Sequence, residues 1–371
     1  MLRWQQRTAS TCPNAYYDNE GYKQSMHMQY VLGVDGGNTK TIALVAALDG
    51  TILGAGRAGC GDIYNAPIEG TNWPDSAAAA IANIEYAVET ALQAAQVKAA
   101  DLVTAVFNMA GADWLEDFAL LETAMKVRGY GRGLTVQNDA MGVLHAGVAD
   151  NIGVSVICGT GGATGARGPD GRTWHSSMWQ DQVQGSLQMS RKAFDAVIRS
   201  ELGIEPPTTI KQRFLDYFGL DSVEEILHLS TGREQRPARR LDGLTRFLLD
   251  EAEAGDVVAR QIVQEHGRAL GNYAVVAARS VGLEGTPFSL VLAGGVLRHP
   301  STLLADTIVE RVQLTSPEVR PTRSRFEPII GVLFSALEAA GKTIGDGLLE
   351  RLVPSLPSSE LFATASDYTQ R

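Results

Sequence analysis

Apolar and polar positions divide the first part of the chain into short buried segments separated by turns. Apolar runs at residues 30–35, 41–48 and 51–57 have the length of buried strands. Asp49-Gly50 lies between the second and the third run and is a usual signal for a two-residue hairpin turn. The pattern predicts three consecutive strands, with a glycine-rich turn between the first two and an Asp-Gly turn between the last two.

The same order of elements is predicted a second time. An apolar run at residues 152–158 enters the turn Gly159-Thr160-Gly161-Gly162, a second strand follows to about residue 167, and a third covers residues 172–175 after another Asp-Gly turn. The two copies share no visible sequence identity. We therefore expect two related domains that face each other, duplicated in architecture rather than in sequence.

Helical spacing of apolar residues alternates with further strands outside these two units. Strands are expected at residues 102–108, 134–137 and 289–292, and helices at 76–96, 114–127, 140–147, 301–312 and 329–340, with a mostly helical stretch over 186–281 that breaks at 206–207, 231–240 and 255. Residues 1–28 and 354–371 lack periodicity, so we expect a disordered leader and a loose tail. The alternation of strands and helices predicts an α/β fold.

Composition narrows the class of protein. The 371 residues are 44% hydrophobic and 20% charged, which is sufficient for an enzyme of two well-buried domains. The net charge of −10 argues against nucleic acid and anionic membranes as partners, and no apolar segment reaches the roughly 20 residues of a spanning helix. Cys12, Cys60 and Cys158 lack the spacing of a disulfide framework or a zinc site. We expect a soluble, cytoplasmic protein.

The turn after the first strand has the chemistry of an anion site. Asp35 ends the strand, and the glycines at 36 and 37 permit positive φ, which leaves the backbone N–H groups of residues 36–39 free to converge on a phosphate. A carboxylate beside phosphate requires a cation between them, and Mg²⁺ commonly binds one or two carboxylates together with phosphates and water. The alternative interpretation is an ordinary hairpin turn.

Two more glycine-rich turns follow strands later in the chain, at residues 159–162 and at 293–295. A phosphate chain fits between the first two turns if they come from opposite domains. The third turn carries no side chain larger than methyl, which lets the backbone approach a flat base and its ribose. The set of three turns predicts a nucleotide site.

Seven segments, in order, resemble those of the actin-like ATPase superfamily of sugar kinases, heat-shock chaperones and actin. Within it the chain is similar to the BadF/BadG/BcrA/BcrD ATPase family, and most to its N-acetylglucosamine and glucosamine kinases, over about residues 29–345. The matching segments are Gly33 to Lys40, Asn65 with Gly70, Ala110 to Asp113, Asn138-Asp139-Ala140, Gly159-Thr160-Gly161, Leu292 to Val296, and Pro328 to Gly331.

The resemblance implies two actin-like (ribonuclease H-like) domains with ATP and sugar in the cleft between them. Residues 29–133 plus 328–350 would form the N-terminal domain and residues 134–327 the C-terminal domain. The activity implied is ATP- and Mg²⁺-dependent transfer of the γ-phosphate to the 6-hydroxyl of an amino sugar, N-acetylglucosamine or glucosamine, by a homodimer.

The resemblance also assigns roles to single residues. Asp113 matches the acid that accepts the proton of the sugar hydroxyl, Asp35 and Asp139 match the acids that hold Mg²⁺, largely through its waters, and Asn65 matches a sugar-binding position. The residues implied in ATP and phosphate binding are Gly36, Gly37, Asn38, Thr39, Lys40, Gly159, Thr160, Gly161, Gly294 and Gly295.

Structural alternatives exist for three of these side chains. Asp113 with Glu116 has the spacing of a capping box at a helix start, and Asp139 also precedes a helix that it would cap. Asn65 in a loop would form an Asx turn.

The chain departs from the family in one segment. These kinases usually carry Gly-Asp-Glu-Gly-Ser after a tryptophan, whereas here Val183-Gln184 precede Gly185-Ser186, with Asp181 two residues early. Either Asp181 substitutes as a substrate-binding residue, or the pocket accepts a different sugar.

A second class within the same family suggests an alternative activity. Its members are ATPases that activate radical dehydratases or reductases through a shared iron–sulfur cluster, which requires cysteine thiolates. Cys60 and Cys158 are the candidates in the part of the chain expected to fold.

Overall fold

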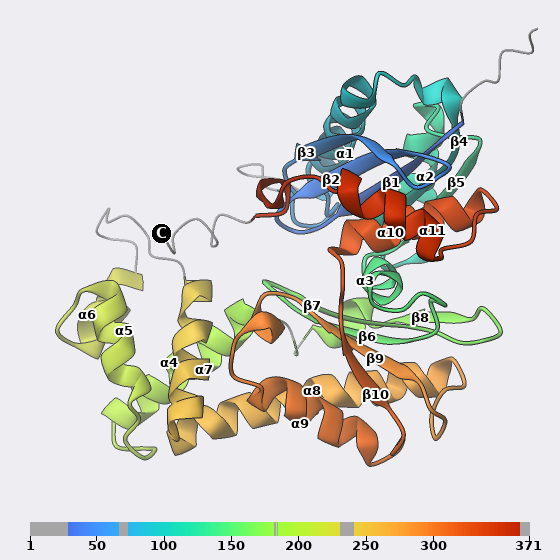
Figure 1. The fold of residues 1–371 in the computed structure, drawn as a ribbon. Coiled ribbons are helices and arrows are strands. Elements are labelled where there is room, and N and C mark those ends of the chain that lie inside the picture. Colours follow the sequence, from blue (N-terminus) through green and yellow to red (C-terminus); the bar gives the residue numbers. More distant parts are fainter. Residues whose placement is uncertain (1–28, 67–72, 182, 184, 231–240, 364–371) are drawn as a thin grey trace, which may run out of the picture.

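The computed structural model describes residues 29–66, 73–181, 183, 185–230 and 241–363, and within them it contains two five-stranded sheets (Figure 1). The strand order is β3-β2-β1-β4-β5 in the first sheet and β10-β9-β6-β7-β8 in the second. Read from the other end, the second order repeats the first. In each sheet three consecutive strands pair antiparallel, and two further strands are added in parallel to the first of the three. The predicted duplication is therefore confirmed.

The strands match the expected segments closely, with one addition. Their bounds are β1 Tyr30–Gly36, β2 Thr41–Ala47, β3 Ile52–Ala58, β4 Leu102–Met109, β5 Gly133–Asn138, β6 Gly153–Cys158, β7 Gly162–Arg167, β8 Thr173–His175, β9 Ser289–Ala293 and β10 Arg320–Arg323. β10 was not predicted, because this short edge strand of Arg, Pro and Thr carries no apolar run.

The helices also follow the predicted periodicity, with one exception. Their bounds are α1 Trp73–Ala95, α2 Leu115–Val127, α3 Ala140–Gly147, α4 Ser186–Glu201, α5 Ile210–Phe218, α6 Val223–Ser230, α7 Thr245–Ala254, α8 Val257–Ser280, α9 Leu303–Gln313, α10 Pro328–Ala339 and α11 Asp346–Leu352. The exception is α11, for which no helix was predicted. The expected break at residues 231–240 and the leader at 1–28 lie outside the described residues. No helix in the described part of the chain combines the length and the hydropathy needed to cross a membrane.

One expected boundary differs from the strand pairing. Residues from 134 onward were expected in the second domain, but β5 pairs in parallel with β4, with Phe107 opposite Val136. β5 is therefore the fifth strand of the first sheet, connected to β4 through the crossover helix α2. We refer to each sheet and the helices packed on it as the first lobe and the second lobe.

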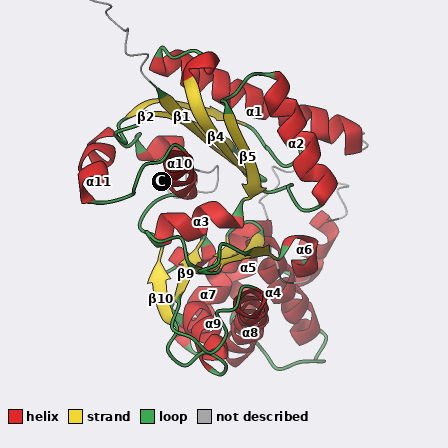
Figure 2. Ribbon diagram, turned by 90° about the vertical axis from the view of Figure 1, so that its right-hand side faces the viewer, coloured by secondary structure: helices red, strands yellow, loops and turns green. Residues whose placement is uncertain are grey.

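Two helices fill the space between the sheets (Figure 2). α10 packs on the first sheet in a cluster that includes Val31 and Leu333, while α3 packs on the second sheet through Leu144 and Val291. The outer faces carry α1 and α2 on the first sheet and α4, α7, α8 and α9 on the second. Sheets and helices therefore form consecutive layers, with α3 against α10 at the centre.

The expected loose tail is only partly correct. Beyond α11, two short 3₁₀ helices, η5 Val353–Ser355 and η6 Ser359–Leu361, continue the chain along the first sheet. Leu356, Leu361 and Phe362 pack against the cluster under α10. Apolar residues in a short irregular segment gave no periodic signal, so sequence pattern missed this docking.

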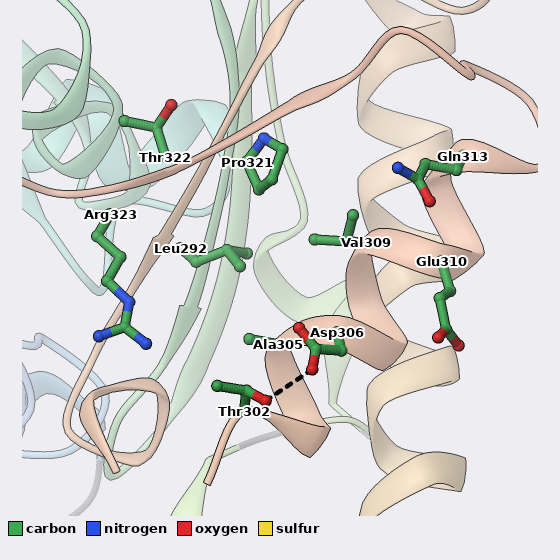
Figure 3. Close-up of a pocket in the computed structure, with 10 residues that line it drawn as sticks. All are labelled: Leu292, Thr302, Ala305, Asp306, Val309, Glu310, Gln313, Pro321, Thr322 and Arg323. Atoms are coloured by element: carbon green, nitrogen blue, oxygen red, sulfur yellow. Dashed lines mark hydrogen bonds between the residues drawn. The ribbon is translucent and has the colours of Figure 1, made fainter. Parts of the chain in front are cut away.

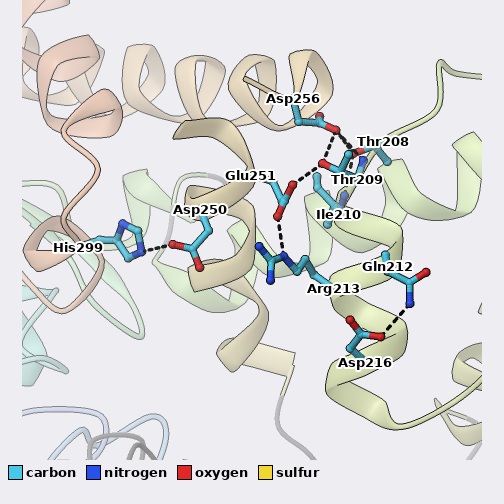
Figure 4. Close-up of polar contacts among 10 residues, drawn as sticks. All are labelled: Thr208, Thr209, Ile210, Gln212, Arg213, Asp216, Asp250, Glu251, Asp256 and His299. Carbon is cyan, nitrogen blue, oxygen red and sulfur yellow. Dashed lines mark hydrogen bonds and ion pairs between the residues drawn. The ribbon is translucent and has the colours of Figure 1, made fainter. Parts of the chain in front are cut away.

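Hydrogen bonds of one carboxylate join the start of α8 to the start of α5 (Figure 4). Asp256 caps α8, since its Oδ1 accepts from the N–H of Ala259 at 2.8 Å. Its Oδ2 accepts from the N–H of Thr209 at 2.7 Å and from the hydroxyl of Thr208 at 2.9 Å. This network fixes the helices behind the second sheet.

Candidate active site

Three acidic residues lie at the carboxyl ends of neighbouring parallel strands in the first sheet. Asp35 is the penultimate residue of β1, Asp113 follows β4, and Asp139 follows β5. Parallel pairing aligns these ends, with Asp35 opposite Asn108. The fold thus brings together the three acids that the sequence singled out.

The environment raises the pKa of two of these carboxyl groups. Burial raises the pKa of Asp35 to about 7, with a smaller contribution from Glu327, and Lys40 opposes the shift. Burial also raises the pKa of Asp139 to about 7, and repulsion by Asp35 is the next cause. Because each charge disfavours the other, a divalent cation between the two carboxylates would be bound favourably.

Asn108 adds a further indication of a polar ligand here. Its side chain is fully buried beside Asp35, and neither its amide nitrogen nor its carbonyl oxygen has a hydrogen-bond partner among the described residues. Buried amides are nearly always paired, directly or through water. The described residues contain no group of three or more His, Cys, Asp or Glu with metal-binding geometry. Two carboxylates, phosphate oxygens and water suit Mg²⁺, so these residues fit the predicted ion.

The glycines of the first turn do not use the positive φ that they permit. Neither Gly36 nor Gly37 has positive φ. Instead, a Cβ on Gly36 would lie 2.1 Å from the methyl carbon of Met109, and a Cβ on Gly61 would lie 3.0 Å from the Cα of Gly36. The turn is held by the N–H of Gly61, which donates to the carbonyl of Gly37 at 3.0 Å. Close backbone approach therefore favours glycine at position 61. At Gly36 the near atoms belong to the flexible end of Met109, and at Gly37 the nearest atom lies 3.5 Å away, so neither position of the turn shows a strict need for glycine.

The tip of this turn presents donors to solvent. β1 and β2 pair as an antiparallel hairpin, so the hairpin interpretation is correct and coexists with an anion site. Asn38 and Thr39 are exposed, and in the described part of the chain their backbone N–H groups donate to no protein acceptor. Lys40 is near enough to Asp35 to lower its pKa. Two free N–H groups and an ammonium form a suitable phosphate cradle.

The capping alternative for Asp113 is wrong. Asp117, and not the Asp113 side chain, accepts the N–H groups at the start of α2, with its Oδ2 2.8 Å from the nitrogen of Trp114 and 3.2 Å from that of Asp113. Burial raises the pKa of Asp113 to about 6, although a hydrogen bond from Ser177 opposes the shift. The carboxylate is therefore available for chemistry.

Asp139 occupies the N-cap position of α3, but in the described structure no side-chain capping hydrogen bond forms there. The neighbouring Asn138 accepts the N–H of Ala140 at 3.2 Å and donates to Oδ1 of Asp113 at 3.3 Å. Asn138 thus links the ends of β4 and β5 and leaves Asp139 facing the other acids.

Asp62 is a fourth acid that sequence reasoning missed. Asp62 is buried, and its charge raises the pKa of Asp113 and of Asp139. Its carboxylate accepts the N–H of Tyr64 at 2.8 Å, so Asp62 forms the Asx turn that was expected of Asn65. Asn65 donates to Asp62 at 2.8 Å and to the side chain of Asn38 at 3.2 Å. The predicted sugar-binding residue thus lies beside the phosphate turn. The sequence does contain a signal that could have identified Asp62 as a site residue, because an acid stands there between the Gly59–Gly61 stretch and Asn65.

One contact joins the two lobes at Asp113. Ser177 begins the 3₁₀ helix η2 (Ser177–Gln180) after β8, with φ of 43°, and its side chain hydrogen-bonds to Asp113 of the first lobe. His175 hydrogen-bonds to Ser177, and its ring meets Phe118 at 5.9 Å between centroids. Asp181 follows η2 with an exposed side chain, and its contact with sugar stays a prediction.

The second and third glycine turns lie against each other. Gly294 has φ of 105°, and a Cβ there would lie 2.3 Å from the carbonyl oxygen of Cys158. A Cβ on Gly295 would meet open space, and this glycine is exposed. The N–H of Gly159 donates to the carbonyl of Gly161 at 2.9 Å, which closes the second turn and leaves Thr160 exposed.

The cysteines within the described residues do not resemble cluster ligands. Cys60 and Cys158 are both buried, and burial raises the pKa of both thiols, to about 12 for Cys158. Neither presents a thiolate at the surface, where a cluster shared with a partner subunit would bind. Cys12 lies outside the described residues.

A groove of about 400 Å³ lies away from these residues, at the edge of the second sheet (Figure 3). It is lined by α9, β10 and Leu292 of β9, and its side chains include Asp306, Glu310 and Arg323. None of the predicted site residues lines it, so the groove has no part in the candidate active site.

Comparisons with known proteins agree with this geometry. A model of the BadF/BadG/BcrA/BcrD ATPase family matches residues 32–336. The N-acetylmuramic acid/N-acetylglucosamine kinase of Clostridium acetobutylicum is 25% identical over 313 residues, which cover 83% of this chain and 98% of that protein. The N-acetyl-D-glucosamine kinase of Dictyostelium discoideum is 22% identical over 324 residues, covering 85% and 99%. A Chromobacterium violaceum structure assigned as an N-acetylglucosamine kinase shares the fold, with a TM-score of 0.58, 20% identity and coverage of 84% and 99%.

Proposed function

Because the chain belongs to the BadF/BadG/BcrA/BcrD ATPase family, we propose that it transfers the γ-phosphate of ATP to the 6-hydroxyl of an amino sugar, N-acetylglucosamine or glucosamine. An ATP-dependent sugar kinase is the activity that both curated relatives carry in their names, and it is consistent with membership of an ATPase family. The observation that carries the proposal is the gathering of Asp35, Asp113 and Asp139 beside a turn whose N–H groups at residues 38 and 39 donate to no acceptor among the described residues.

Phosphoryl transfer depends mainly on positioning and on neutralising charge. The N–H groups of Asn38 and Thr39 and the ammonium of Lys40 would hold phosphate oxygens from the first lobe, and the turn with Thr160 from the second. Asp35 and Asp139 would hold Mg²⁺, which when bound neutralises charge on the phosphates. Closure of the two lobes would exclude water, which otherwise competes with the sugar for the phosphate.

One carboxylate is suited to receive the proton of the sugar hydroxyl. We assign this role to Asp113, and its pKa of about 6 and its hydrogen bond with Ser177 of the second lobe support the assignment. A carboxylate that orients the hydroxyl in phosphoryl transfer need not be strongly basic. Asp139 keeps its role as a holder of Mg²⁺.

The decisive experiment measures ADP release from ATP–Mg²⁺ without sugar and with N-acetylglucosamine, glucosamine, N-acetylmannosamine or N-acetylmuramic acid. Strong stimulation by one sugar supports the kinase and names its substrate. In Asp113→Asn, sugar-dependent turnover should fall about 10²-fold or more while nucleotide binding persists. Near-normal turnover in this variant would remove Asp113 from the mechanism. Asp170→Asn, on the exposed β7–β8 turn, is the control.

The alternative to a sugar kinase is an ATPase that activates a radical dehydratase or reductase, and the same assay tests it. Sugar-independent hydrolysis by brown, iron-containing protein would overturn the kinase proposal. The buried state of Cys60 and Cys158 favours the kinase. We also propose a homodimer, which sedimentation of the purified protein tests directly.

A further inference from the structure

The C-terminal segment from η5 to residue 363 is attached to the first lobe by more than apolar packing. The hydroxyl of Ser355 accepts the N–H of Ile52, at the start of β3, at 2.9 Å. Leu361 and Phe362 then pack beside the residues of β2 and α10. The segment lies beyond the residues that match the family model, which end at 336, so it is a feature of this chain outside the matched region.

The end of this segment binds two cationic side chains through consecutive carbonyl groups. The guanidinium of Arg57, on β3, donates to the carbonyls of Glu360 at 3.1 Å and Leu361 at 2.9 Å. The ammonium of Lys40 donates to the carbonyl of Phe362. Carbonyl groups at the end of a helical turn carry partial negative charge, so they attract cations. The carbonyl of Glu360 also accepts the N–H of Ala363 at 3.4 Å.

Lys40 belongs to the turn that presents its N–H groups to solvent, two residues from Asn38. An ammonium group has three N–H donors. One of them is donated to the carbonyl of Phe362. A lysine side chain loses much rotamer freedom when it is ordered, and this loss occurs before nucleotide arrives if the carbonyl already holds the side chain in place.

We propose that the carbonyl end of η6 positions Lys40 for the phosphate chain of ATP, which makes residues 359–363 a positioning element of the nucleotide site. The proposal rests on the role given to Lys40 under the proposed function. Arg57 holds the segment in place through the carbonyls of Glu360 and Leu361. The opposite effect, in which Phe362 competes with phosphate for Lys40, would make removal of the segment strengthen nucleotide binding.

The test compares two truncations of the full chain. One ends after Ser358 and removes the carbonyl groups, and its matched control ends after Ala363 and keeps them. Binding of ATP–Mg²⁺ without sugar is measured by calorimetry, and KM for ATP and kcat are measured with the stimulating sugar. We expect the shorter chain to bind ATP about tenfold more weakly with little change in kcat, and the control truncation to match the full chain.

A double-variant cycle separates positioning from general damage to the fold. In Lys40→Met, truncation after Ser358 should weaken ATP binding no further, because both changes remove the same interaction. Arg57→Leu, which loosens the segment without truncation, should weaken ATP binding in the Lys40 parent but not in Lys40→Met. Should truncation destabilise the protein too strongly to assay, Arg57→Leu carries the test alone.

The inference would be overturned if truncation left ATP binding unchanged or made it tighter. It would also be overturned if the effects of truncation and of Lys40→Met on ATP binding multiplied in the double variant. In either case, sugar phosphorylation by the parent would still support the kinase proposal. A parent chain that binds no ATP would overturn both.

Discussion

Side chains next to the four acids determine which carboxylates remain for chemistry. Asp117 and Asn138 accept the N–H groups at the starts of α2 and α3. Asp113 is thereby released from capping, which the sequence offered as its alternative role. Asp139 forms no capping hydrogen bond in the described structure, although a hydrogen bond from the N–H of Ala140 lowers its pKa slightly against the effect of burial. The raised pKa values of these acids follow from burial among like charges.

The same pKa shifts predict how stability depends on pH. The pKa values of Asp35 and Asp139 rise from 3.8 to about 7 in the folded protein. Between these values the folded state retains protons that the unfolded state has released, so stability falls as pH rises through that window. We expect the thermal midpoint of metal-free protein to fall from pH 5 to pH 8, with a smaller fall in Asp35→Asn or with Mg²⁺ present.

Asp170→Asn is the control for that measurement, because the pKa of Asp170 is lowered, chiefly by a hydrogen bond from the N–H of Arg172. It should follow the parent between pH 5 and pH 8. A pH profile of Asp35→Asn that coincides with the parent would contradict the burial of a protonated carboxyl at this position.

Among the elements, the contact of α3 with α10 sets how the two lobes are joined. The helices meet at Gly142 and Gly331, where a Cβ on Gly331 would lie 2.0 Å from the carbonyl oxygen of Gly142 and 2.5 Å from the nitrogen of Ala146. These neighbours are backbone atoms, which cannot turn aside as a side chain does. Glycine at 331 therefore permits the close crossing between the sheets.

Gly331→Ala should destabilise the protein by about 1–3 kcal/mol, since the helices must separate to admit the methyl group and the gain in helix propensity is smaller. Gly347→Ala, in the first turn of α11 where a Cβ meets nothing within 4 Å, is the matched control and should be neutral or slightly stabilising. Urea unfolding of both variants measures the difference. Equal stability of the two would show that the crossing adapts.

Across the whole molecule, Ser177 of the second lobe controls the carboxylate of the first. Its hydrogen bond holds the pKa of Asp113 below the value that burial alone would give. In Ser177→Ala, that pKa should rise, and the acid limb of the pH profile of kcat/KM should move up by about one unit. An unmoved limb would mean that Asp113 is not the group that titrates during turnover.

Ser177→Gly serves as the companion variant. This change also removes the hydroxyl, but glycine adopts the positive φ of 43° at this position without strain. The acid limb of its pH profile should therefore move as in Ser177→Ala, while its stability should be higher than that of Ser177→Ala. This comparison separates the hydrogen bond from backbone conformation.

The sequence alone determined the order and most bounds of the strands and helices, the duplicated unit, the three glycine turns and the acids at strand ends. These follow from local periodicity and turn chemistry, which act over a few residues. Tertiary structure decided what depends on neighbours distant in the chain: the place of β5 in the first sheet, the pairing of β10, the docking of the C-terminal segment on Lys40, and the addition of Asp62 and Ser177 to the site. Such contacts join residues separated by tens to hundreds of positions, so no local pattern encodes them.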